Sequence, residues 1–361
     1  MNKDFALKIR LSNILWSLGY YTRLEVKLAE YGSTRGIPLE LTDLDVLGIR
    51  ISPDFVFDYI VADCTSNKDV IKSPIQRAFW LKGVMDLFGS SRGYLAVDTR
   101  NSIPESQRRV SAKLGVTILN EENLCNLEKR TLDSDTGKLK LGQAGSWLYH
   151  ERNLATLRKE LDPLLRFRKH DYWINEHYQN IVTILTALPK YNNLMEENNR
   201  FHKALVIDLM SLLSLSLLHM GRFVFQTNPE NAKQELRAYV YGGYRELKMR
   251  EGIVQNIRKL VESSQQQRSL FDSDIKLDPE YLPRLFDLVF RWINKPADAA
   301  QILRYLQVVL FEKTLHNQGN PQGMETIEKG FSDITKKFVK DLAFLIIGIK
   351  GLSETMAVDV L

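Results

Sequence analysis

The sequence predicts a two-part protein: an N-terminal α/β domain with a mixed sheet flanked by helices, followed by an all-α C-terminal domain. Helical and alternating apolar patterns are interleaved in residues 1–130, whereas nearly every apolar pattern in residues 146–361 has the helical period. A length of 361 residues also suits two domains better than one. Residues 131–145, rich in Asp, Ser and Gly, are expected to be the linker.

The first elements of the N-terminal domain are a helix and three strands. Apolar residues at helical spacing stop at Gly19, which is typical of a helix C-terminus. An alternating pattern then predicts a strand over 20–31, and two short runs rich in Val, Ile and Leu predict strands at 41–49 and 57–65. The turn residues Ser52-Pro53-Asp54 separate these two runs, so we expect three consecutive antiparallel strands.

Helices and strands alternate in the rest of this domain. Pro74 suits a first helical turn, and the stripe that follows it ends at Gly89. The remaining predicted elements are a strand at 93–97, a helix at 104–114, a strand at 116–119 and a helix from Asn120.

The C-terminal domain is expected to be entirely helical. The predicted helices span 146–169, 171–188, 192–225, 230–264, 279–294, 296–316 and 324–350, with breaks at residues such as Pro189. The most apolar run, 204–221, contains Asp208 and His219, which are costly in lipid, so a buried helix is favoured over a membrane span. With no export signal at its start, the chain is expected to be a soluble, cytoplasmic protein without a membrane partner.

Composition permits a nucleic-acid partner without demanding one. Lys and Arg exceed Asp and Glu by five, and the isoelectric point is about 8.9. Cys64 and Cys125 have no metal-ligand spacing and are expected to be reduced thiols. No phosphate-binding glycine loop, dinucleotide fingerprint or nucleophile elbow occurs, so the sequence does not support a kinase, dehydrogenase or serine hydrolase.

Two aspartates lie in the neighbouring strands of the predicted sheet. Asp45 enters the apolar strand 41–49, and Asp63 ends the next strand 18 residues later. Adjacent antiparallel strands can bring the two carboxylates together as hard oxygen ligands for Mg²⁺. A metal held there could activate water for attack on a phosphate. Asp43 would replace Asp45 if the register differed by two residues.

The strands that carry these acids resemble the PD-(D/E)XK nuclease superfamily, particularly its Mrr-like and Holliday-resolvase-like branches. Asp45-Val46 is similar to the first acidic motif, Val61-Ala62-Asp63-Cys64 to the second, and the segment 92–119 to the closing α/β unit. The resemblance covers about residues 5–127. It implies a restriction-endonuclease-like fold, DNA as a partner, a role in antiviral defence and, if the site is active, an endodeoxyribonuclease with Mg²⁺ bound by Asp45 and Asp63.

One departure from the family pattern leads to two hypotheses about the site. The family lysine would fall at Thr65, which cannot supply a positive charge. In one hypothesis a lysine has migrated to Lys68, Lys72 or Lys82 and the site is catalytic. In the other, which we favour, the site is degenerate, and the protein is a binding or scaffolding subunit of a bacterial DNA-defence or DNA-processing complex. The helical domain would then bind a protein partner, and oligomerisation is left open.

Two further features have a simpler interpretation and a functional one. Glu25 could be a third acid, but it is interpreted as a solvated strand residue. The basic residues and aromatics between Trp147 and Trp173, Arg168 among them, could follow a nucleic-acid backbone. A solvated helix face with inward aromatics is the favoured interpretation of this run.

Overall fold

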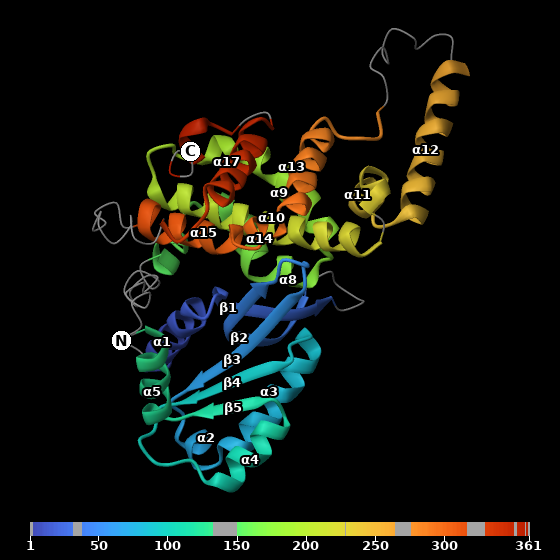
Figure 1. Cartoon of the computed structure of the whole chain (residues 1–361). Coiled ribbons are helices and arrows are strands. Elements are labelled where there is room, and N and C mark those ends of the chain that lie inside the picture. Colours follow the sequence, from blue (N-terminus) through green and yellow to red (C-terminus); the bar gives the residue numbers. More distant parts are fainter. Residues whose placement is uncertain are drawn as a thin grey trace.

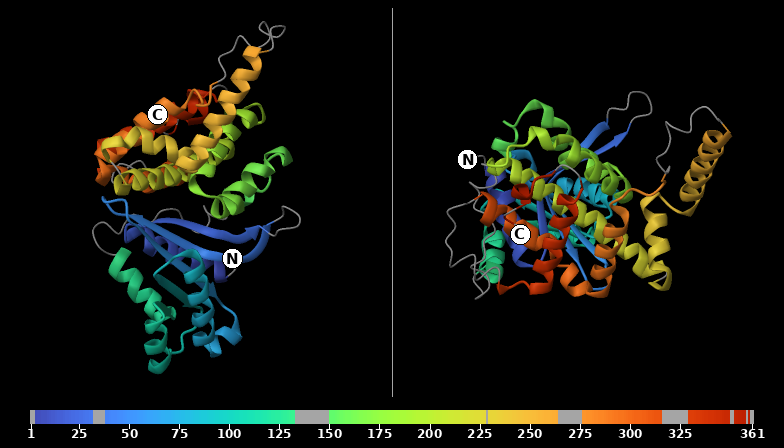
Figure 2. Two further views of the ribbon diagram at one scale, coloured as in Figure 1. Left: turned by 90° about the vertical axis from the view of Figure 1, so that its right-hand side faces the viewer. Right: turned by 90° about the horizontal axis from the view of Figure 1, so that it is seen from above.

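The computed structural model describes residues 3–31, 38–132, 150–227, 229–263, 276–315, 329–349, 352–357 and 359. A mixed five-stranded sheet with flanking helices forms the N-terminal part, and helices form the C-terminal part (Figure 1). From the side, the helical part lies as a layer over the N-terminal strands (Figure 2). The predicted order, a mixed α/β region followed by a helical one, is confirmed. Residues 133–145 of the predicted linker lie outside the described residues.

The sheet has the order β1-β2-β3-β4-β5. The strands β1, β2 and β3 are antiparallel as predicted, and β4 and β5 run parallel to β3. Parallel neighbours need a crossover connection, which helices supply here. The strands span Tyr21–Tyr31, Pro38–Ile51, Phe57–Thr65, Arg92–Val97 and Val116–Leu119; the crossover helices are α2 (Lys68–Lys72), α3 (Pro74–Phe88) and α4 (Glu105–Lys113).

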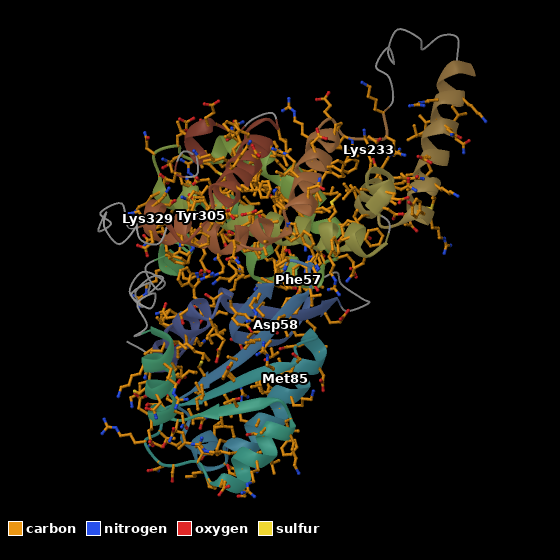
Figure 3. The ribbon with its side chains drawn as sticks, in the orientation of Figure 1. Phe57, Asp58, Met85, Lys233, Tyr305 and Lys329 are labelled. Carbon is orange, nitrogen blue, oxygen red and sulfur yellow. The ribbon has the colours of Figure 1, made fainter. Side chains whose placement is uncertain are left out.

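Helices cover both faces of the sheet because successive strand residues point to opposite sides. The helices α1 (Lys3–Ser17) and α5 (Glu121–Leu132) cover one face, where Ile14 of α1 joins a cluster with Val46 and Ile60. Helix α3 covers the other face. Its Met85, labelled in Figure 3, lies so close to β4 that a Cβ atom at Gly93 would be 2.7 Å from the Met85 sulfur.

Helix α10 (Arg200–Thr227) packs against several other helices of the C-terminal part. This part also contains α9 (His177–Tyr191), α11 (Ala232–Val240), α12 (Tyr244–Ser263), α13 (Leu282–Asn294), α14 (Pro296–Ala299), α15 (Ile302–Val308) and α17 (Asp333–Ile347). Short helical segments connect them: η1 (Lys159–Leu161), α7 (Asp162–Arg166), η2 (Phe167–Asp171), α8 (Tyr172–Ile174), η3 (Asn192–Leu194), η4 (Pro229–Asn231), η5 (Val309–Leu315) and η6 (Glu354–Ala357).

Helix α10 is the core of this part. Among the described residues, its span Arg200–Gln226 is the one helix long and apolar enough to cross a membrane, and 94% of that apolar window is buried inside the protein. Such burial is consistent with the core helix of a soluble protein, as predicted for this run. Two serines of α10 have different partners: Ser211 donates to the carbonyl of Ile207 one turn earlier, and Ser216 shares a hydrogen bond with the Tyr172 hydroxyl at 2.9 Å.

Several predicted helix boundaries are wrong: the predicted helix 171–188 breaks between Ile174 and His177, and the predicted helix 192–225 begins only at Arg200. The predicted helix 146–169 is interrupted before η1, and the π-helical η2 follows α7. Helix α9 continues past Pro189 to Tyr191, since a proline so near the C-terminus removes few helical hydrogen bonds. The predicted helix 230–264 breaks at Gly242-Gly243, where φ angles of +87° and +116° separate α11 from α12.

Candidate functional site

The strand register places Asp45 opposite Asp63. Val46 pairs with Ala62 in the antiparallel ladder of β2 and β3, so the next position along brings the two aspartates across from each other. The ladder ends there. Asp45 Oδ2 accepts the backbone N–H of Cys64 at 2.7 Å, which takes a donor out of the strand pairing.

The second oxygen of Asp45 contacts a lysine of α1. Lys8 Nζ lies 2.7 Å from Asp45 Oδ1, and both side chains are 12% exposed. Burial raises the pKa of Asp45, while Lys8 and the Cys64 N–H oppose that rise. Burial alone would lower the pKa of Lys8, but Asp45 and Glu25 bring it above its usual value, so Lys8 is a cation at neutral pH.

Asp63 is held by a bidentate arginine of α3. Arg77 Nε and Nη2 donate to the two Asp63 oxygens at 2.8 and 2.6 Å. The Arg77 guanidinium also lies 3.5 Å from the centre of the Trp80 ring, which fixes its plane. Because Asp63 is only 6% exposed, this pair satisfies a carboxylate that water barely reaches.

Glu25 of β1 belongs to the same group of charges, so its interpretation as merely solvated is wrong. Its oxygen accepts from Lys8 Nζ at 3.2 Å. Glu25 has φ +54°, in the left-handed region that is costly for a residue with a side chain. It interrupts the β1–β2 pairing between the Leu24–Val46 and Val26–Leu44 pairs, beside Asp45. We call Lys8, Glu25, Asp45, Asp63 and Arg77 the strand-end cluster.

The structure does not bring the lysines proposed from the sequence into this cluster. Lys82 pairs with Asp86 one helical turn away at 2.5 Å, and Lys72 pairs with Asp69. Lys68 is exposed in the first turn of α2. In the described part of the chain, the ion pairs of Asp45 and Asp63 are those with Lys8 and Arg77.

The remaining candidates are placed as follows. Thr65 accepts the backbone N–H of Asn67 through its hydroxyl and so helps to start the turn before α2. Asp43 is exposed and stands across from Lys27 of β1, so Asp45 and not Asp43 is the residue beside Asp63. Cys64 and Cys125 are both free.

Sequence reasoning missed Lys8 and Arg77. Both lie on helices that precede or follow the acidic strands, and nothing in their spacing shows that they face a carboxylate. Arg77 is one helical turn before the buried Leu81 of α3, which is a signal that it points toward the sheet. Lys8 carries the same signal, because Leu11 and Ser12 one helical turn further along α1 are both buried.

The cluster as arranged does not fit a resident divalent ion. Its three carboxylates and two cations leave one net negative charge. Mg²⁺ requires oxygen ligands at about 2.0–2.1 Å in near-octahedral geometry. All four oxygens of Asp45 and Asp63 already accept hydrogen bonds or ion pairs from the protein. No group of three or more His, Cys, Asp or Glu side chains suited to a metal is found among the described residues.

A second cluster of charges joins the two parts of the molecule. Asp208 of α10 accepts hydrogen bonds from two arginines. Arg23 of β1 donates through Nη1 to Oδ1 at 2.6 Å, and Arg168 of η2 donates to Oδ2. Arg168 also pairs with Glu151 at 2.8 Å. We call Arg23, Glu151, Arg168 and Asp208 the seam cluster. The interpretation of Arg168 as part of a solvated face is therefore wrong, since it is 5% exposed.

The inner side of the seam cluster has no room for a substrate, whereas Glu151 and Arg168 also line an open pocket of about 330 Å³ on its outer side. The inner cavity, lined by Asp208 and His150, holds about 20 Å³, close to the volume that one water needs. Arg23 and Arg168 keep the pKa of Asp208 well below its usual value despite the burial that would raise it. The cluster holds β1 against α10.

A comparison with protein families, curated proteins and solved structures finds no match for this chain. Its function is therefore inferred from its own residues.

Proposed function

We propose that this chain is a DNA-associated protein whose N-terminal domain resembles the PD-(D/E)XK nucleases but binds or scaffolds without cutting. The observation that carries this proposal is the neutralisation of both acids by the protein itself: Lys8 on Asp45 and Arg77 on Asp63. Cations built into α1 and α3 occupy the positions that a catalytic metal would need. Magnesium is accordingly no part of the proposed resting protein.

The energetics of the Arg77–Asp63 pair support this proposal. Binding a metal through Asp63 requires the bidentate pair to break, which leaves Arg77 without its partner carboxylate. Hydrogen bonds to charged groups contribute about 1.5–3 kcal/mol each. The free energy gained by binding a divalent cation would have to exceed both that loss and the cost of dehydrating the cation. In this proposal the mixed sheet with Asp45 opposite Asp63 serves as a DNA-binding scaffold without turnover.

DNA as the partner rests on the resemblance of residues 5–127 and on the excess of five basic residues. A role in a cytoplasmic, bacterial DNA-defence or DNA-processing complex follows from the same resemblance. The second partner is a protein bound through the helical part. Helix α12 projects away from the body (Figure 1) and exposes Met249 and Ile253 by 54% and 51%. Arg245, Lys248 and Arg250 beside them favour an acidic partner.

A second candidate function is an active Mg²⁺-dependent DNA endonuclease with a migrated lysine. One observation favours it: Lys8 Nζ lies 2.7 Å from Asp45 Oδ1 and so places an ammonium group beside the paired acids. In this candidate, Lys8 rather than Lys68 or Lys82 would be the electrostatic helper. Asp45 and Asp63 would hold the metal after releasing Lys8 and Arg77.

Parallel DNA-binding and DNA-cleavage assays test the proposal. Fluorescence anisotropy with labelled duplex DNA at stated, increasing salt should give binding that weakens as salt rises. Incubation with supercoiled plasmid in Mg²⁺ or Mn²⁺ should leave the plasmid intact. The variant Asp63→Asn should bind DNA as the wild type does.

The outcomes separate the candidates. Nicking by the wild type that is abolished both in Lys8→Met and in Asp63→Asn would overturn the proposal in favour of the endonuclease. Nicking that persists in both variants indicates a contaminating nuclease, and the binding result then decides. Absence of any salt-dependent DNA binding would overturn both candidates. Lys82→Met is the matched control, because Lys82 pairs with Asp86 outside the cluster.

A further inference from the structure

A cleft with aromatic walls lies where the sheet part meets the helical part. It encloses about 340 Å³ between the β1–β2 hairpin, the C-terminal end of α3 and the segment from α8 to the start of α9. Binding sites for small organic ligands usually have volumes of about 300–1,000 Å³. Phe57, labelled at this seam in Figure 3, belongs to the layer of rings behind the cleft.

The aromatic walls are held in fixed orientations. Tyr59 and Phe88 pack edge to face with centroids 5.5 Å apart, and Phe88 lies 6.5 Å from Trp173. The Trp173 indole N–H donates to the carbonyl of Arg168 at 3.2 Å. The Tyr59 hydroxyl lies 2.9 Å from His219 Nε2. Each polar end is therefore used within the protein, and the ring surfaces remain as the part of these side chains that a ligand can contact.

A stack of three rings supports this wall. Phe57, His219 and His177 lie at successive centroid distances of 3.7 Å and nearly parallel. Burial lowers the pKa of His177 to about 4, so this cleft residue is neutral at pH 7. The cleft thus has a rigid, uncharged aromatic base, which lowers the entropic cost of binding a flat ring.

The charged group that lines the cleft, Glu30, disfavours an anionic ligand, although Arg23 and Arg222 lie 5.8 Å and 5.9 Å from the Trp173 and Phe57 ring centres. Glu30 has no ion pair in the described part of the molecule, and no lysine or arginine is among the lining residues. Asn175 supplies an amide whose side chain has no hydrogen bond among the described residues. A ligand should therefore offer an N–H donor to the Glu30 carboxylate and a mixed donor and acceptor edge to Asn175. It should also carry no phosphate inside the cleft.

We propose that this cleft binds the amino-bearing heteroaromatic ring of a nucleobase, stacked against the aromatic wall with its exocyclic amino group toward Glu30. Adenine, guanine and cytosine carry such an amino group, whereas uracil, thymine and hypoxanthine lack it. The ring can come from a free nucleoside or from an unstacked base of a single strand. The site is separate from the strand-end cluster, because none of its lining residues belongs to that cluster.

Isothermal titration calorimetry with adenosine and inosine tests the site on the full chain. The two nucleosides differ at the position of the amino group. The wild type is expected to bind adenosine at least about tenfold more tightly than inosine, the difference made by one hydrogen bond to a charged group. In Glu30→Gln this preference should fall to about threefold or less. Glu122→Gln, an exposed glutamate far from the cleft, should leave it unchanged.

A second variant tests the aromatic wall. Phe88→Leu keeps an apolar side chain of similar length and is expected to weaken binding of both nucleosides by at least about fivefold, because base stacking on an aromatic ring contributes about 1–3 kcal/mol. Circular dichroism of the variant checks that it folds. Short single strands of deoxyadenosine distinguish the sources: tighter binding than adenosine indicates a strand, and equal or weaker binding indicates a free nucleoside.

Two results would overturn the site. One is the absence of saturable adenosine binding by the wild type. The other is binding that Glu30→Gln and Phe88→Leu both leave unchanged. Neither result bears on the binding of duplex DNA, so failure of this site and failure of the proposed function are separate observations.

Discussion

Two clusters of the same residue types differ in how far water reaches them. In the seam cluster, Asp208 is 3% exposed between Arg23 and Arg168, and the cavity beside Asp208 is too small for a ligand. In the strand-end cluster, the side chain of Arg77 stays 34% exposed and that of Glu25 39% exposed. Burial fixes the first cluster as a brace between two parts of the fold. The second keeps an open side at which a metal, a nucleic acid or a solvent ion can compete.

The largest effect is expected from breaking the seam cluster. Asp208→Asn leaves Arg23 buried with no partner charge and Arg168 with Glu151 alone, and should lower the free energy of unfolding by about 3–5 kcal/mol. Urea denaturation followed by circular dichroism measures it. Asp333→Asn is the control, since Asp333 pairs with Lys336 while fully exposed. Similar midpoints for the two variants would show that the seam cluster does not brace the molecule.

The next effect sharpens the role of Arg77. Arg77→Gln leaves the two oxygens of Asp63 without their cation and should increase the affinity for Mn²⁺ at least about tenfold, or about 1.4 kcal/mol. Isothermal titration calorimetry compares it with the wild type. Arg109→Gln, whose exposed partner is Glu105, should not change the affinity. If Arg77→Gln also leaves it unchanged, Arg77 is not what keeps the metal out.

The pH dependence of the free energy of unfolding also tests how deeply the seam cluster is buried. His150 beside Asp208 is 1% exposed, and its ring nitrogens have no hydrogen-bond partner within the described residues. Burial lowers its pKa from 6.5 to about 4. A histidine whose folded pKa is lowered contributes stability above its unfolded pKa, and that contribution is lost as the pH falls from about 6.5 toward 4.

His150→Leu removes this titration. Between pH 6.5 and 4 the free energy of unfolding should fall less steeply than in the wild type, by up to about 1.4 kcal/mol for each pH unit. At pH 8 the pH dependence of the two proteins should be the same. His177 and His219 still titrate in the variant, so some acid loss remains. Parallel curves over the whole range would contradict the buried, neutral state of His150.

The smallest effect is expected at Lys82, one of the three lysines suggested by the sequence. Lys82 is 37% exposed and pairs with Asp86 on the same helix. Lys82→Ala should change the free energy of unfolding by less than about 1 kcal/mol. It should leave DNA binding and any cleavage unaltered. A loss of either as large as that in Lys8→Met would mean that Lys82 reaches the acids in solution.

Local patterns in the sequence were sufficient to predict most elements of the N-terminal fold. The strands at 57–65 and 93–97 and the helix 75–88 could be predicted because alternation, β-branched residues and terminal Pro and Gly residues are local signals. The helical part was predicted less well, since its breaks depend on backbone conformations such as the paired positive φ angles at Gly242-Gly243. The course of the backbone after residue 150 depends on the ion pair between Arg168 and Asp208, which is a tertiary contact.

The acids of the candidate site could be predicted, whereas their partners could not. Asp45 and Asp63 interrupt apolar strands, and antiparallel register alone places them opposite each other. Lys8 and Arg77 come from helices on different sides of the sheet, so only the packing of α1 and α3 decides which cation meets which acid. The strained φ of Glu25 is likewise invisible in its alternating strand.

The central claim is that Lys8 and Arg77 neutralise the acids and leave no metal at the strand ends. Crystals of the wild-type protein grown with Mn²⁺, measured for anomalous scattering near the manganese edge, test it directly. The account predicts no anomalous peak between Asp45 and Asp63, with Arg77 still bidentate on Asp63. A manganese peak bonded to both carboxylates, with Lys8 and Arg77 displaced, would contradict it.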